Sequence, residues 1–387
     1  MKGQSANRRN YTFFPFRNRA AVAVALPFFI MSMMFGSWIA RLPDIKNRLD
    51  LSEGQVGLCL LGIALGSLFA TPMTVFILRK MHTKTAVFTA TAAVCFAFTL
   101  PALAQGGLVL FLLLILVGLS EGFLNISMNA AAADLEKRDD IKIMSTCHGM
   151  FSLGLAIGAA LSGYISRTGF SFFWHIVIIA AVMMTLSAAF RPLLEGVPDG
   201  GKDEAGFVFP PKPVLLLGFI CMCFNIGEGS VSDWAAVYLR DTIGSDAFTA
   251  GLGLAVFSTG MAIGRFSGDF IRARFTSVRI LVTGGVVTVI GLLLTVFMTA
   301  EWGVLGGLFA AGLGLSLSVP VIYSESTQTE GVAPDVGLAA VATFSIVGFM
   351  CGPPLIGFIS EMTSLRYGFG FTAMLAALGT VLVLWRR

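Results

Sequence analysis

The chain has 387 residues, of which 56% are hydrophobic and only 12% charged, and its net charge is +4. Soluble domains carry roughly 25% charged residues, so this chain has too little charge to cover a water-soluble globule of its size. The composition excludes collagen and disorder, and the six cysteines all lie in apolar stretches, which excludes a disulfide-rich scaffold. The basic residues form no dense stripe of the kind that nucleic acid requires. We therefore expect an all-α membrane protein.

Apolar stretches long enough to cross a bilayer recur along the whole chain. One helical crossing takes ~20 mainly apolar residues. Twelve such stretches are separated by polar breaks, approximately at residues 20–40, 54–77, 86–104, 108–132, 143–164, 172–190, 214–237, 247–268, 279–299, 303–323, 337–359 and 368–385. Helices also satisfy every backbone polar group in lipid. The sequence therefore predicts twelve transmembrane helices.

The longest polar break divides the predicted helices six and six. It is rich in proline and glycine, which is typical of a flexible linker. Residues 158–166 and 352–360 form an internal repeat at an offset of 194 residues. We predict an N-terminal six-helix half at 1–190, a linker at 191–213 and a C-terminal six-helix half at 214–387. Two pseudo-symmetric halves that face each other suit alternating access to a central site.

The distribution of positive charge predicts the orientation in the membrane. With the N-terminus in the cytoplasm, 20 of the 26 Lys and Arg residues lie on the cytoplasmic side, Arg265 among them. Cytoplasmic loops of membrane proteins carry such an excess. We therefore expect both termini, and the linker, to be cytoplasmic.

The fourth stretch contains polar residues at helical spacing. Glu121, Asn125 and Asn129 are each four residues apart, so they lie on one face of a helix. A carboxylate at the centre of a bilayer costs ~2.5–3.5 kcal/mol on insertion scales, and such residues usually serve function. We predict that Glu121 takes part in proton coupling and that Asn125 and Asn129 bind substrate.

Two further stretches carry candidate site residues. In the seventh stretch, Asn225 and Glu228 share a face, and we predict substrate binding by Asn225 and proton coupling by Glu228. At the start of the fifth stretch, His148 and Ser152 share a face, and we predict that both contact substrate. The remaining candidates are two tryptophans that would stack on a substrate ring, Trp38 and Trp234. Asp233, nearer the outer surface, is expected at the interface or in a gate.

A motif after the eighth stretch resembles a known transporter family, the major facilitator superfamily. The resemblance rests on Gly264, Gly268, Asp269, Arg272, Arg274, Phe275 and Arg279. It implies that Asp269 pairs with Arg272, Arg274 and Arg279 in a cytoplasmic latch that takes part in gating. The first-half counterpart keeps the basic residues and lacks the Asp, so we expect a latch in one half only.

Within that superfamily, the fourth stretch resembles the fucose/proton symporters and the rhizopine-associated, MosC-like bacterial membrane proteins. The resemblance implies that Glu121 and Asn125 serve proton coupling and sugar binding. One departure stands out, because the carboxylate that the fucose symporters carry on their first helix is Ile39 here. Glu228 is the candidate to replace it.

The leading hypothesis is a proton-coupled secondary transporter for a small hydroxylated solute such as a sugar or polyol. The alternative is a proton-driven exporter of amphipathic compounds, in which Glu121 or Glu228 would be the counter-charge. No His-Glu-x-x-His and no phosphate loop is present, and we expect no enzyme. The expected partners are a small-molecule substrate, protons and lipid, and sodium coupling stays open. We expect a monomer in the inner membrane of a bacterium, with no cofactor, metal or nucleic acid.

Overall fold

A computed structural model describes residues 18–78, 80–197 and 212–386, and all regular structure within these residues is helical. The elements are α1 (Arg19–Ile39), α2 (Leu42–Arg48), α3 (Glu53–Leu78), α4 (Thr83–Ala97), η2 (Leu100–Leu103), α5 (Gly107–Asp139), α6 (Met144–Arg167), α7 (Phe172–Phe190), η3 (Arg191–Gly196), α8 (Lys212–Val237), η4 (Tyr238–Ile243), α9 (Ala247–Phe266), α10 (Gly268–Arg272), α11 (Ser277–Phe297), α12 (Glu301–Leu315), α13 (Ser318–Ser326), α14 (Pro334–Met362) and α15 (Leu365–Trp385). Within the described residues, twelve helical segments are long and apolar enough to cross a membrane. The predicted twelve transmembrane helices are confirmed.

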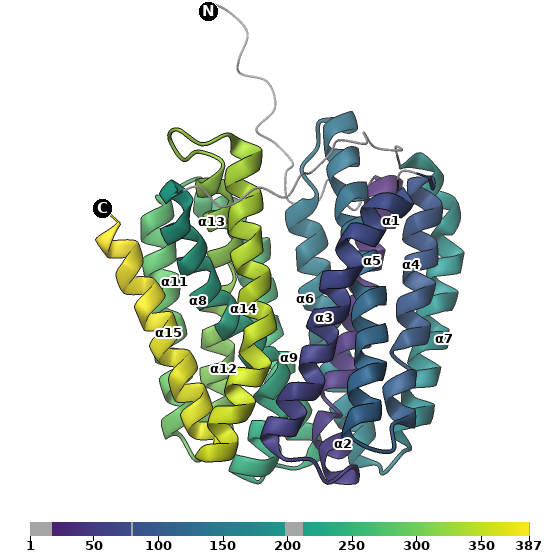
Figure 1. The fold of residues 1–387 in the computed structure, drawn as a ribbon, viewed down its shortest axis with the longest axis vertical. Helices are drawn as coiled ribbons and strands as arrows, with labels where there is room; N and C mark the ends of the chain where they lie inside the picture. The colour runs from purple at the N-terminus through teal and green to yellow at the C-terminus, as the bar shows by residue number, and fades with distance from the viewer. Residues whose placement is uncertain (1–17, 79, 198–211, 387) are drawn as a thin grey trace, which may run out of the picture.

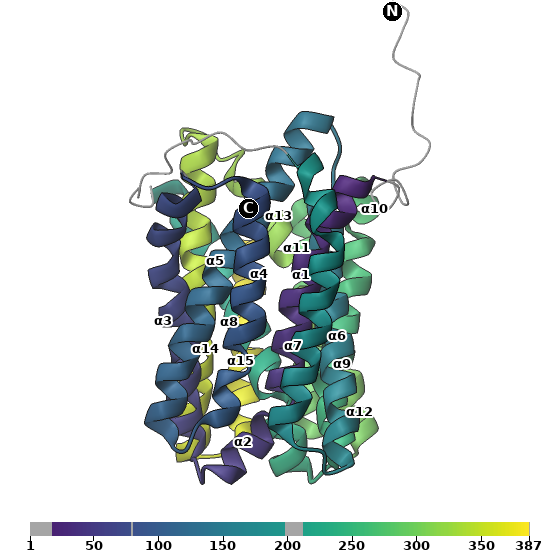
Figure 2. The same cartoon turned by 90° about the vertical axis from the view of Figure 1, so that its right-hand side faces the viewer.

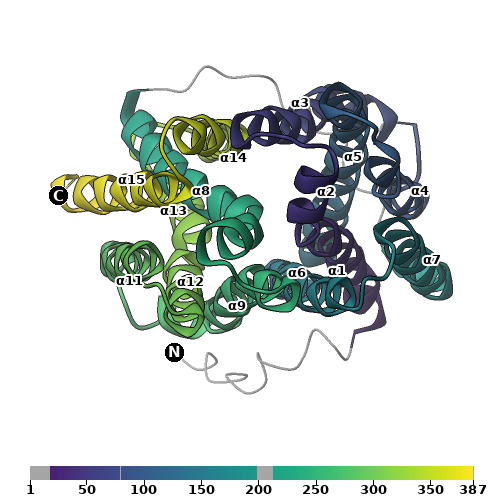
Figure 3. The same ribbon diagram turned by 90° about the horizontal axis from the view of Figure 1, so that it is seen from below.

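The helices form two groups that stand side by side (Figure 1). We call α1 to α7 the N half and α8 to α15 the C half. The view in Figure 3 shows α6 beside α9 and α3 beside α14, and these two pairs pack together across the halves. The predicted boundaries stay a prediction, since residues 198–211 of the linker lie outside the described residues and its first residues form η3.

The bundle has two distinct ends (Figure 2). At one end, which we call the terminal end, α1 begins and α15 finishes; at the other, the α2 end, the short helix α2 lies between α1 and α3. The hydrophobic pattern did not predict α2, because seven residues are too short to show a periodicity. Its proline at the second helical position fits the first turn, where no backbone donor is needed.

The predicted helix at 303–323 is broken. Ser316 and Leu317 separate α12 from α13, and Pro320 lies in the first turn of α13. Continuing α12 would bring the Pro320 ring against the carbonyl of Ser316, four residues earlier. The helix therefore ends at Leu315 and restarts at Ser318, which leaves a helix break inside the bundle at the terminal end of the C half.

Candidate functional site

The predicted polar stripe lies along one helix, α5. Asn129 Nδ2 donates to Asn125 Oδ1 at 2.8 Å, so the two amides hold each other along the helix face. Asn125 is exposed, whereas Glu121 is buried, with 8% of its surface accessible. The Glu121 carboxylate has no hydrogen-bond or ion-pair partner among the described residues. A carboxylate that is both buried and unpaired is costly. The charge of Glu121 therefore has to be neutralised by a group other than the described residues.

A second carboxylate, in the C half, lies near Glu121. Asp233 on α8 is close enough to Glu121 for their charges to repel each other. Asp233 is half-buried and, within the described part of the chain, forms no ion pair. Each half therefore contributes one unpaired acid to the interior of the bundle. Two like charges in such a place favour a bound proton or a bound cation.

Arg265 on α9 links the two halves. Its Nη2 donates to Glu228 Oε1 on α8 at 2.9 Å, and its Nη1 donates to Ser152 Oγ on α6 at 2.7 Å. The side chains of Arg265 and Glu228 are 14% and 15% exposed, so the ion pair is largely shielded from solvent. The count of Lys and Arg on the two sides of the membrane treats Arg265 only as a cytoplasmic charge. Its place inside the apolar stretch 247–268 is the signal that could have marked it as functional.

A buried polar group with an unused acceptor lies one turn before Glu228 in α8. Asn225 has no exposed surface, and its Nδ2 donates to Ser345 Oγ on α14 and to Cys221 Sγ at 3.4 Å. The Asn225 Oδ1 has no donor. Buried acceptors are nearly always satisfied, so this oxygen is open to a donor that the protein itself does not supply.

The remaining predicted substrate contacts occupy different environments. His148 on α6 is exposed, and its ring stands edge-on to Phe28 with 5.5 Å between the ring centroids. Ser152, one turn further, is buried and receives the hydrogen bond from Arg265. Trp38 and Trp234 have no exposed surface, so in this conformation neither ring offers a free face for stacking.

The predicted latch lies at the terminal end, in α10 and at the start of α11. Arg274 lies over the Phe270 ring at 3.5 Å and Arg279 over the Phe275 ring at 5.1 Å. Arg272 is exposed. The side chain of Asp269 lies outside the described residues, and the pairing of Asp269 with these arginines stays a prediction.

The α2 end holds a network of polar contacts between the halves. Lys46 on α2 donates to Asp241 Oδ2 on η4 at 2.6 Å and to Glu53 Oε1 on α3 at 2.9 Å. Burial works to lower the pKa of Lys46, but the hydrogen bonds to Asp241 and Glu53 outweigh it and raise the pKa above its usual 10.5. Lys46 is therefore a permanent cation between two acids, one from each half.

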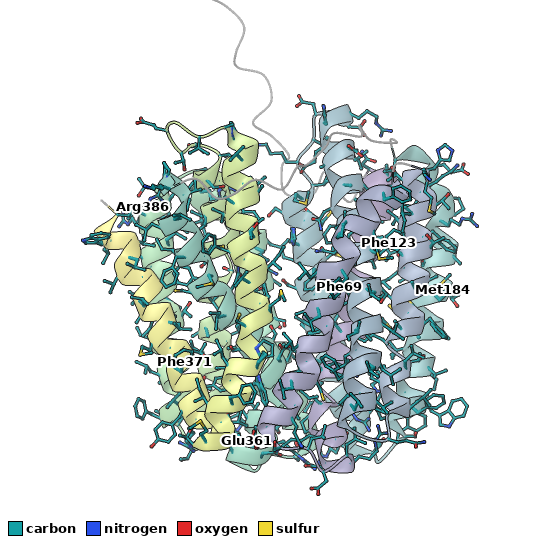
Figure 4. All side chains as sticks on the ribbon, viewed as in Figure 1. Phe69, Phe123, Met184, Glu361, Phe371 and Arg386 are labelled. Atoms are coloured by element: carbon teal, nitrogen blue, oxygen red, sulfur yellow. The ribbon has the colours of Figure 1, made fainter. Side chains whose placement is uncertain are left out.

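Three neighbouring contacts reinforce this closure. Ser52 Oγ donates to Glu361 Oε1 of α14 at 3.0 Å, and Figure 4 shows Glu361 at this end. Arg167 and Asp246 approach to 3.4 Å. A Cβ on Gly57 would lie 2.9 Å from the Pro353 carbonyl oxygen, so α3 and α14 touch through their backbones. The halves are thus joined at the α2 end by charge, hydrogen bonds and close packing.

No group of three or more His, Cys, Asp or Glu side chains in the described residues is arranged to hold a metal ion. The polar groups of the site are carboxylates, amides, the guanidinium of Arg265 and the imidazole of His148. These groups can carry a proton and exchange hydrogen bonds with a polar solute.

Comparison with known proteins identifies the family. The model of the Major Facilitator Superfamily matches residues 23–329. An uncharacterized MFS-type transporter of Yersinia pestis is 30% identical over 92% of both chains. The membrane protein MosC of Rhizobium meliloti is 27% identical over 91% of this chain and 86% of its own.

A solved structure shares the fold. The Escherichia coli fucose:proton symporter matches 98% of this chain and 100% of its own with a TM-score of 0.62, at 14% identity. The predicted resemblance to fucose symporters and MosC-like proteins is confirmed at the level of family and fold, and with it the prediction of a transporter rather than an enzyme. The chain belongs to the major facilitator superfamily of membrane transporters.

Proposed function

We propose that this transporter moves a small hydroxylated solute, of the sugar or polyol class, by alternating access of its two halves and with coupling to protons. The observation that carries the proposal is the stripe on α5, where the unpaired carboxylate of Glu121 lies on the same helix face as the hydrogen-bonded amides of Asn125 and Asn129. One face of one helix thus offers both a proton acceptor and ligands for hydroxyl groups.

Glu121 is the proposed proton carrier. The carboxylate is buried, and no cation or hydrogen-bond donor of the described chain neutralises it. Asp233, which forms no ion pair within the described residues, adds a second acid to the same interior from the C half. Protonation therefore stabilises this arrangement, and separation of the halves would favour release. Such a link between proton binding and conformation is what proton coupling requires.

The proposed ligands for the solute come from both halves. The N half offers Asn125, Asn129 and the exposed imidazole of His148. The C half offers Asn225, whose Oδ1 lacks a donor. A hydroxyl group is donor and acceptor at once, so a polyhydroxylated solute satisfies amides and imidazole together. The printed name of the fucose:proton symporter, a protein of the same fold, describes a transporter of this kind.

Glu228 and Arg265 are proposed to act in the conformational step. Glu228 is held by Arg265, which also reaches Ser152 on the opposite half. Protonation of Glu228 would remove its pull on the guanidinium and so weaken the link to α6. In this proposal Glu228 responds to protons through Arg265, whereas Trp38 and Trp234, both fully buried, contribute only if the interior opens in another state.

The closed α2 end is proposed to face the outside of the cell. The excess of Lys and Arg at the opposite end supports this orientation, with both termini in the cytoplasm. The proposed location is the inner membrane of a bacterium, in keeping with the bacterial relatives, and the proposed working unit is a monomer.

The second candidate is a proton-driven exporter of amphipathic cations. It is favoured by one observation, the acids Glu121 and Asp233, one from each half, which form no ion pair within the described residues. A positively charged solute would neutralise both. The two candidates differ in the solute that binds, because a polyol needs the amides and a cation needs only the acids.

Thermal unfolding of the detergent-purified protein tests the choice. The panel contains sugars, polyols, inositols and lipophilic cations, and a ligand at 100 times its Kd stabilises by ~2.7 kcal/mol. We expect stabilisation by a hydroxylated solute in the wild type and its loss in Asn125→Ala. Asn47→Ala, which removes an exposed amide at the α2 end, is the matched control. Stabilisation by lipophilic cations alone would contradict the polyol proposal and favour export.

A further inference from the structure

The C half has a groove at its terminal end, away from the polar interior. Its volume is about 470 Å³, within the ~300–1,000 Å³ of small-molecule sites. Residues of α9, α10, α11 and the α12–α13 break line it, among them Gly264, Ile271, Arg279, Thr283 and Leu317. We call it the α11 groove.

The floor of the α11 groove is built from closely packed helices. A Cβ on Gly264 would lie 1.9 Å from Ser316 Oγ, and a Cβ on Gly284 would lie 2.5 Å from the Gly314 carbonyl oxygen. α9 and α11 therefore both sit tightly on the end of α12. Any side chain larger than that of glycine at these two positions would clash with the end of α12. The shape of the groove floor is therefore set by the packing of α9 and α11 on α12.

Two of the helices that line the groove also carry exposed apolar side chains. Phe270, Val286 and Ile290 in α10 and α11 are 61%, 46% and 53% exposed. Exposed apolar side chains on a membrane-spanning helix contact acyl chains of lipid, and a groove that opens among them is accessible from the bilayer.

Positive charge gathers in the segment that leads into α11, whose Arg279 lines the groove. Arg272 and Arg274 are exposed in this segment. Segment 268–279 contains three arginines against one aspartate, which leaves a formal charge of +2. In the described residues no carboxylate pairs with these three guanidinium groups, and two of them lie over phenylalanine rings. Arg279 lines the groove itself, so its guanidinium can contact an anion that binds there.

A second groove of similar size provides a contrast. It measures about 480 Å³ and lies at the α2 end between α3 and α5, where Leu58, Leu108 and Phe111 line it. No basic residue lines this groove. An apolar groove alone gives no reason to prefer one headgroup over another, whereas an apolar groove that is lined by an arginine does.

We infer that the α11 groove binds an anionic phospholipid, with an acyl chain in the groove and the phosphate on Arg279. Basic side chains near a membrane surface attract anionic lipids, and basic pockets between transmembrane helices bind their headgroups. A chain in the groove would touch Leu317, which precedes α13, and α13 packs on α8 and α14. Lipid binding would therefore fix the broken helix against the two helices that carry Glu228, Asn225 and Ser345. The inference does not depend on the identity of the transported solute.

Lipid titration of the purified full chain tests the inference. Thermal unfolding in a mild detergent is followed while dioleoylphosphatidylglycerol or dioleoylphosphatidylcholine is added, and native mass spectrometry counts the retained lipids. We expect stronger stabilisation by the anionic lipid. Arg279→Gln should weaken its apparent affinity about five-fold and leave the zwitterionic lipid unaffected. Thr283→Trp, which fills the groove from an exposed position, should reduce the response to both lipids.

Two control variants keep the test specific. Lys142→Gln removes an exposed charge at the same end of the N half, and Leu108→Trp fills the groove that lacks a cation. Both should retain the wild-type response to the anionic lipid. Equal responses of the wild type to the two lipids, or wild-type affinity in a folded Arg279→Gln variant, would overturn the inference.

Discussion

Replacing Lys46 by methionine should open the α2 end of the bundle. Lys46 is the cation between Glu53 and Asp241, and only its contact with Asp241 crosses from the N half to the C half. When the halves separate at this end, Lys46 keeps Glu53 and loses Asp241. The variant therefore removes an interaction that exists in the closed state and is absent from the open one, so it shifts the equilibrium between them.

The size of the shift follows from the partial burial of this pair. The Lys46 and Asp241 side chains are 12% and 24% exposed, with 2.6 Å between Nζ and Oδ2. Fully exposed pairs contribute ~0.2–1 kcal/mol, and hydrogen bonds to charged groups ~1.5–3 kcal/mol. With a discount for residual solvent, we expect the loss of about 1–2 kcal/mol. That corresponds to a rise of roughly 5–30-fold in the ratio of open to closed molecules.

Spin labels on the two halves measure this ratio. Thr168→Cys on the N half and Met362→Cys on the C half are exposed at the α2 end, in a Cys351→Ser background because Cys351 is the exposed native cysteine. Lys46→Met should increase the long-distance population between the labels. Asp241→Asn should do the same, and the double variant should add little, because both remove one interaction.

The matched control is Glu53→Gln. It removes the other acid from Lys46, but that contact lies within the N half and survives opening. Glu53→Gln should therefore shift the distances less than Lys46→Met. The reasoning would be refuted by an unchanged distance distribution in Lys46→Met, or by an equal shift in Glu53→Gln.

Three further predictions concern pH, packing and the buried ion pair. Because the pKa of Lys46 is raised above 10.5, its contribution is complete below that pH and is lost only above the raised value, so label distances should not widen from pH 7 to 9. Gly66→Ala should lower the melting temperature, because its Cβ would lie 2.2 Å from a backbone oxygen and overpacking of this kind costs about 1–3 kcal/mol of stability. Gly306→Ala, with open space around the Cβ, should leave the melting temperature unchanged. Arg265→Met should destabilise the protein because it leaves Glu228 unpaired, by at most about 3–5 kcal/mol, since the pair keeps some exposure to solvent. Glu228→Gln in the same molecule should restore much of this loss in a thermal unfolding assay.

The helices and the α5 stripe could be predicted because they depend on local sequence. Twelve apolar stretches separated by polar breaks mark the crossings, and a spacing of four residues places Glu121, Asn125 and Asn129 on one face of any helix. The apolar stretch 303–323 does not predict the break between α12 and α13, although it contains Pro320. A proline inside a transmembrane stretch can be accommodated by its neighbours, so the residue alone does not decide between a kink and a break.

The contacts between the halves could not be predicted because they join residues far apart in the sequence. Lys46 and Asp241 are 195 residues apart, and Ser152 and Arg265 are 113 apart. The sequence around each of these residues does not indicate which residue it contacts. Arg265 meets Glu228 only because α8 and α9 pack together, and the burial of Trp38 and Trp234 likewise follows from tertiary packing. Pairing across the halves is a property of the fold and leaves little trace in a single sequence.

Transport by Glu121→Gln in proteoliposomes tests the central claim most directly. The isosteric change removes the charge from a carboxylate that has no described partner, so the protein should stay folded. With the solute identified by thermal stabilisation, we predict that Glu121→Gln loses accumulation driven by a pH gradient and keeps solute exchange without a gradient. Glu195→Gln, an exposed acid at the terminal end, should behave as wild type. Full gradient-driven accumulation by Glu121→Gln would contradict the claim that Glu121 carries the proton.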